Sequence, residues 1–197
     1  MRRKTFDAMV STGGLVLAAI LLIAGGLLIW AHNFTDSNVH NQLSQQQIFF
    51  PDKAGIAAQK SAEITKYVTP YAGQQVLNGR QAQVFADHYI GVHLSEQPMG
   101  GVYSKLSAAS RANPSDATLA AAVDTSFKGT TLRGMLLNAY AFWQIGQIAL
   151  WGAVSSFIAA GLLLLLSALG FLHLRRTSPE AEVLPKLGAH TPAPVEQ

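Results

Sequence analysis

The sequence predicts an all-α membrane protein in which two transmembrane helices flank an extracytoplasmic helical domain with helical stalks. No Asp, Glu, Lys or Arg occurs from Ala8 to Thr35 or from Gly134 to Leu174. Charged residues make up 13% of the chain, against about a quarter in an average soluble domain. The segment between the two uncharged stretches has mixed composition and helical spacing of its apolar residues.

The first transmembrane helix is expected over residues 9–31. Its apolar run from Met9 to Trp30 is long enough, at ~1.5 Å per residue, to cross a hydrocarbon core of ~30 Å. Trp30 stands where an interfacial aromatic residue belongs. A cleaved signal peptide is the alternative, since Arg2, Arg3 and Lys4 would suit its basic region. The long apolar run and the lack of a small-residue cleavage site favour an uncleaved signal anchor.

The second transmembrane helix is expected over residues 145–174, where the apolar run from Ile148 to Leu172 ends at Arg175 and Arg176. Basic residues therefore follow this span and precede the first one, which places both termini in the cytoplasm of a plasma-membrane protein. The expected layout is a cytoplasmic segment over 1–8, an extracytoplasmic domain over 32–144, and a proline-rich, disordered cytoplasmic tail over 175–197.

Small residues recur at four-residue spacing in both spans, which puts them on one face of each helix. They are Gly14 and Ala18 in the first span, and Gly152, Ser156 and Ala160 in the second. Such faces allow close approach of helix backbones. This pattern predicts tight pairing of the two spans with each other, with homodimerisation as the open alternative.

Helix signals are also present between the spans. Asn78 and Gln81 have the form of a capping box and precede an apolar stripe of Ala82, Phe85, Tyr89 and Val92. A hairpin turn at Asn78-Gly79 is the alternative, but neither flank alternates as a strand would.

Three further helices are predicted in this segment. A short helix is expected around Leu106, and Asn113 and Pro114 suit the N-cap and first position of the next one. A separate helix should open near Gly129 and continue into the second span without a breaker, for about 65 Å from Thr131 to Leu174. The first span should likewise extend outward and stop at Phe49 to Pro51, because proline disfavours helix in the residue before it.

Few residues suggest chemistry. His32, Asp36 and His40 follow the first span at four-residue spacing, and two imidazoles with a carboxylate are a plausible ligand set for a divalent metal. The alternative is a hydrated polar helix face. A second polar group, Asp87 to Tyr89 with His93, lacks the spacing of helical zinc pairs. No cofactor motif is present, the chain has no cysteine, and its scattered basic residues give no nucleic-acid footprint.

Several segments resemble a family of uncharacterised actinobacterial two-span membrane proteins. They are the stretch from Thr131 to Arg176, the segment Gln46 to Pro51, and the segment Tyr71 to Gln75. The resemblance implies a high-GC Gram-positive source and the two-span layout, and it carries no functional residue.

Two function classes follow from these observations. The first is a non-enzymatic envelope protein that contacts the lipid bilayer and whose outer domain binds a protein partner or ligand, or self-associates. The second is a metal-dependent envelope enzyme or metal-binding protein that uses His32, Asp36 and His40.

Overall fold

The computed structural model describes residues 3–176, and within this range it is mostly helical, with no strand. The one strand-like feature there is an isolated antiparallel bridge between Phe49 and Gln75. The predicted all-helical class is therefore confirmed for this range. The predicted disordered tail lies almost entirely outside it.

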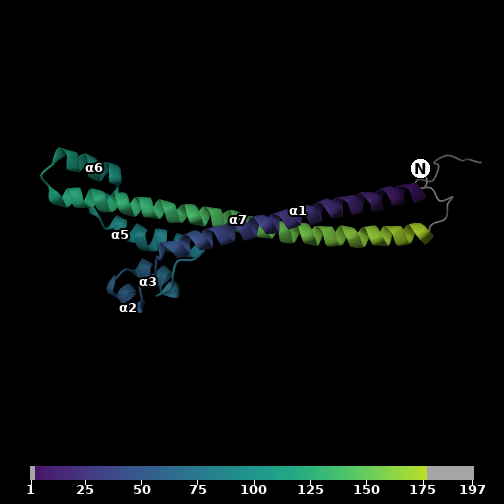
Figure 1. Ribbon diagram of the computed structural model, residues 1–197, viewed down its shortest axis with the longest axis horizontal. Coiled ribbons are helices and arrows are strands. Elements are labelled where there is room, and N and C mark those ends of the chain that lie inside the picture. Colours follow the sequence, from purple (N-terminus) through teal and green to yellow (C-terminus); the bar gives the residue numbers. More distant parts are fainter. Residues whose placement is uncertain (1–2, 177–197) are drawn as a thin grey trace, which may run out of the picture. The chain divides into compact units, whose positions relative to one another are not determined.

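The helices are labelled in Figure 1. They are α1 (Arg3–Gln46), α2 (Lys53–Ala58), α3 (Ala62–Val68), α4 (Gly79–Phe85), α5 (Gly91–Ser95), α6 (Tyr103–Ala112) and α7 (Ala117–Arg176), with a π turn η2 (Ala86–Ile90) and 3-10 turns η1 (Thr69–Tyr71) and η3 (Pro98–Gly101).

The chain divides into two compact units, to both of which α1 and α7 contribute. The apolar unit consists of the residues up to Leu28 and from Trp151 onward, and the helical domain consists of Ile29–Leu150. Both α1 and α7 are long and apolar enough to cross a membrane. In the apolar unit large side chains such as Ile23 and Leu166 are more than 60% exposed. Exposing so many apolar side chains to water would cost free energy, whereas a lipid environment would not impose that cost.

The core of the helical domain gathers side chains from several elements. Leu43 of α1, Leu136 of α7, and Ile64 and Val68 of α3 are all at most 2% exposed. They surround Ala82, Val84 and Ala86, which follow one another along α4 and η2. The short helices thus bury their apolar faces against the stalk-forming parts of α1 and α7.

The predicted N-cap at the start of α4 is confirmed, but the reciprocal bond of the capping box differs from the prediction. The Gln81 backbone N–H donates to Asn78 Oδ1 at 2.9 Å, and Gln81 Oε1 accepts from the Leu77 backbone N–H at 2.8 Å. The Gln81 side chain therefore bonds to the residue before the N-cap, whereas in a capping box it would bond to the N-cap residue itself. The hairpin alternative at Asn78-Gly79 is wrong, because Gly79 is the first residue of a helix.

Two predicted helix boundaries are wrong. Asn113 follows α6 as its C-cap, and Asp116 Oδ1 instead accepts from the backbone N–H groups of Thr118 and Leu119 at 2.9 and 3.1 Å. Helix α7 then runs unbroken through Gly129. Glycine costs a helix only about 1 kcal/mol, and at Gly129 the missing side chain leaves space for Leu94, whose Cδ2 lies 2.7 Å from where a Cβ atom would be.

The end of α1 is close to the prediction. The helix stops at Gln46, and Gln47 adopts a left-handed backbone with φ of 52°. The segment Phe49 to Pro51 is non-helical, as proline predicts. There the Phe50 backbone N–H donates to the Gln74 carbonyl at 2.9 Å, which returns the chain toward the core.

Candidate ligand-binding groove

The helical domain contains a groove of about 600 Å³ whose walls combine ionisable, amide and aromatic side chains. We call it the Trp143 groove. Its lining residues are Asp36, His40, Tyr71, Leu77, Asn78, Arg80, Gln81 and Trp143. Pockets that hold small ligands commonly measure about 300–1,000 Å³ and pair apolar walls with a few polar groups. The groove therefore has the size and chemistry of a ligand site.

Three elements position these side chains. Asp36 and His40 are four residues apart on α1 and so lie on one face of that helix. The capping box fixes Asn78 and Gln81 at the start of α4, and Gln81 Nε2 also donates to Gln74 Oε1 at 3.2 Å. Trp143 comes from α7 and packs against the core cluster. The walls thus belong to capped or well-packed helices.

The start of α4 lies directly against α7. A Cβ atom added at Gly79 would come within 2.3 Å of Trp143 Cβ, so only glycine fits there. Gly79 is itself buried. Asn78 and Arg80, on either side of Gly79, line the same groove as Trp143.

The groove holds charges of both signs that do not neutralise each other. Within residues 3–176, Asp36 and His40 make no side-chain hydrogen bond or ion pair. Arg80 donates from Nη1 to Gln83 Oε1 at 2.9 Å, which uses one of its five N–H donors. A free carboxylate and a largely free guanidinium therefore line one groove.

His32, the remaining residue of the predicted metal set, has a different role. Its Nδ1 donates to the Gly146 carbonyl at 3.0 Å, which ties α1 to α7. In the described part of the chain no group of three or more His, Cys, Asp or Glu side chains is arranged to hold a metal ion. Metal binding by His32, Asp36 and His40 stays a prediction that metal titration would test.

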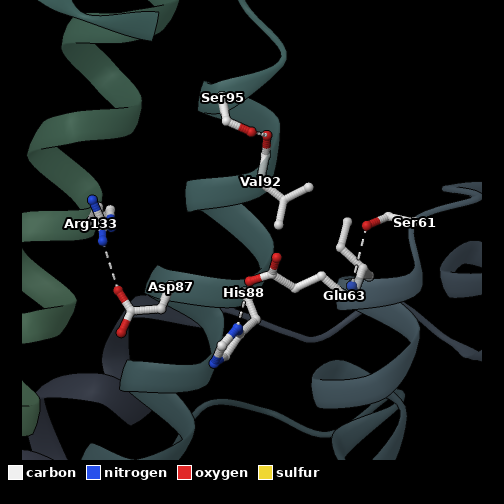
Figure 2. A network of polar contacts seen from close by, with 8 residues as sticks. Ser61, Glu63, Asp87, His88, Val92, Ser95 and Arg133 are labelled. Atoms are coloured by element: carbon white, nitrogen blue, oxygen red, sulfur yellow. Dashed lines mark hydrogen bonds and ion pairs between the residues drawn. The ribbon is translucent and has the colours of Figure 1, made fainter. Parts of the chain in front are cut away.

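The second polar cluster forms cross-links between helices (Figure 2). Asp87 Oδ1 accepts from Arg133 Nη2 of α7 at 2.8 Å, and His88 Nδ1 donates to Glu63 of α3 at 3.0 Å. His88 also stacks on Tyr67 with 3.8 Å between ring centroids. Asp87 and His88 point to different partners and do not form a catalytic dyad.

These cross-links start from the π turn η2, which the sequence did not predict. The wider turn lies between α4 and α5 without ending the helix. Such turns are often found at functional sites. Here the turn supplies one residue to α7 and the next to α3, so its role in this structure is to join helices.

The five predicted helix-packing residues lie in the apolar unit. A Cβ added at Gly14 would meet Ser167 Oγ, and one at Gly152 would meet Leu28 Cδ1 at 3.3 Å. Ala18 and Ala160 are fully buried. Ser156 is half-buried and bonds to the Gly152 carbonyl of its own helix at 2.9 Å. Gly25, against Phe157, and Gly170, against Ser11, were missed.

Sequence reasoning found Asp36 and His40 but missed the rest of the groove. Arg80 falls inside the predicted capping box, and Trp143 falls in the stretch that was predicted to extend the second apolar helix. No local signal marks either as a groove residue, because the two are 63 positions apart in the chain and come to line one groove only in the folded structure. No family model, curated protein or solved structure matches the chain.

Proposed function

We propose that the chain is an integral membrane protein of a bacterial cell envelope, with Met9–Trp30 and Ile148–Leu172 crossing the plasma membrane. The exposed apolar surfaces of α1 and α7 support this, because lipid would solvate them. The basic residues Arg3 and Lys4 before the first span, and Arg175 and Arg176 after the second, support a cytoplasmic location for both termini.

The helical domain then lies outside the cytoplasm and acts as a non-enzymatic binding module. The observation that carries this proposal is the Trp143 groove, whose lining brings the exposed, unpaired Asp36 and His40 of α1 together with Arg80 of α4 and Trp143 of α7. Partly satisfied charges beside aromatic walls favour recognition of a polar ligand. The resemblance to actinobacterial two-span proteins makes a high-GC Gram-positive source part of the proposal.

The absence of cysteine from the sequence allows a direct test of topology. Ala108, an exposed residue of α6, and Thr5, an exposed residue of α1, can each be changed to cysteine in an otherwise cysteine-free protein. In intact cells a membrane-impermeant maleimide should label Ala108→Cys, and it should label Thr5→Cys only after the membrane is permeabilised. Labelling of Thr5→Cys in intact cells, or extraction of the protein by carbonate, would contradict the proposed layout.

A further inference from the structure

Resting on the proposed function, we propose that the Trp143 groove binds a zwitterionic amino acid or short peptide that has a free ammonium and a free carboxylate. The ammonium would pair with Asp36 and the carboxylate with Arg80. An apolar side chain of the ligand would lie against Trp143 and Leu77.

The charges of the groove select this ligand class. A ligand that carries only negative charge would meet the unpaired Asp36 carboxylate, and one that carries only positive charge would meet the Arg80 guanidinium. Like-charge contacts of this kind disfavour a partner. A small ligand with one charge of each sign satisfies both groups at once.

The two charged side chains also suit the two ends of a peptide. A guanidinium presents a planar set of donors that matches a carboxylate with two parallel hydrogen bonds. A carboxylate accepts charge-assisted hydrogen bonds from an ammonium, and the neighbouring indole and phenol faces attract cations. Of the two amides in the lining, that of Gln81 is bonded to Leu77 and Gln74, whereas the Asn78 amide NH2 keeps its donors for a ligand carbonyl.

Neighbouring cavities lack this combination. A groove of about 330 Å³ between α1 and α7 is lined by amides such as Asn38, Gln42 and Asn138 and contains no charged residue. A smaller one beside Tyr89 and His93 also has no carboxylate or guanidinium. The paired opposite charges are specific to the Trp143 groove among these three.

The test measures binding of alanyl-phenylalanine to the full-length protein in nanodiscs of anionic lipid by isothermal titration calorimetry. The same dipeptide with an acetylated amino group, and with an amidated carboxyl group, should each bind at least about tenfold more weakly, as expected for loss of one charge-assisted contact. Phosphoethanolamine, which represents a lipid headgroup, should bind more weakly than the free dipeptide.

Variants assign each end of the ligand to its residue. Asp36→Asn should weaken binding of the free dipeptide at least about tenfold and leave the acetylated one unchanged. Arg80→Gln should do the same to the free dipeptide and leave the amidated one unchanged. Arg111→Gln is the matched control, because its guanidinium also donates to a nearby side chain of its own helix, Ser107 at 2.6 Å, outside the groove.

Several results would overturn the ligand class. One is no heat of binding with the free dipeptide at millimolar concentration. Others are blocked dipeptides or phosphoethanolamine binding as tightly as the free dipeptide, or more tightly. The last is a loss of affinity in Arg111→Gln equal to that in Arg80→Gln. If the dipeptide fails while Asp36→Asn removes a protein partner that the wild type retains in mild detergent, the groove binds a protein and the peptide proposal falls. The maleimide labelling pattern tests the membrane layout independently of either result.

Discussion

At the residue scale, the same residue type has opposite roles at two positions in the helical domain. Gly79 lies against Trp143 with no room for a Cβ atom, whereas Gly134 of α7 has no atom within 4 Å of such a position. Helix propensity favours alanine over glycine at both sites. The tertiary contact at Gly79 reverses that preference.

Gly79→Ala should therefore destabilise the protein by about 1–3 kcal/mol, as inserted methyl groups do in close-packed sites. Gly134→Ala should stabilise it by about 0.5–1 kcal/mol through the backbone entropy of the unfolded chain. Thermal unfolding in detergent, followed by circular dichroism, shows whether each variant is more or less stable than the wild type. A stabilising Gly79→Ala would mean that α4 does not approach Trp143 as described.

At the scale of elements, the boundaries of the helices depend on which side chain satisfies the first backbone N–H groups. Asn113 and Asp116 both suit an N-cap, and Pro114 strengthens the case for Asn113. The structure uses Asp116 instead, since α6 extends to Ala112 and takes Asn113 as its C-cap. The short connection of residues 113–116 thus has to end α6 and begin α7.

Replacement of these two residues distinguishes the alternatives. Asp116→Ala should cost about 1 kcal/mol of stability, because two N–H groups at the start of α7 lose their acceptor. Asn113→Ala should cost only a few tenths of a kcal/mol, since its side chain makes one exposed 3.3 Å bond to the Ala109 carbonyl. The denaturant midpoints of the two variants show which one loses more stability. A larger loss of stability in Asn113→Ala than in Asp116→Ala would contradict the assignment of Asp116 as the N-cap.

At the scale of the molecule, close packing of α1 against α7 in the apolar unit depends on small residues. Ser11 lies at Gly170, and Ser167 lies at Gly14, so a Cβ atom at either glycine would collide with a serine hydroxyl. Gly13, the neighbour of Gly14, has open space around it. Adjacent glycines on one helix therefore provide a matched pair.

Cysteines at Ser11 and Gly170 should form an intramolecular disulfide under a mild oxidant, because the two positions are in contact. Adding Gly14→Ile should reduce the disulfide yield severalfold by forcing the helices apart, and adding Gly13→Ile should leave it unchanged. Electrophoresis without reductant measures the yield. Disulfide-linked dimers in place of the internal bridge would favour homodimerisation of the spans.

The sequence by itself determined the features that depend on local composition and spacing. The long uncharged runs predicted the two apolar helices, and Asn78 with Gln81 predicted the start of α4, because hydrophobicity and capping act within a few residues. Likewise, Pro51 predicted that α1 would not continue past it, and the small residues Gly14 and Ala18 indicated one face of the first span.

Only the tertiary structure decided the features that depend on residues far apart in the chain. Leu94 packs against Gly129, through which α7 runs unbroken, and the contacts of Asp87 with Arg133 and of His88 with Glu63 accompany an unpredicted π turn. The Trp143 groove has walls from α1, α4 and α7, and the approach of α4 to α7 depends on the missing side chain of Gly79. Such contacts join residues from different helices, so no single stretch of sequence contains them.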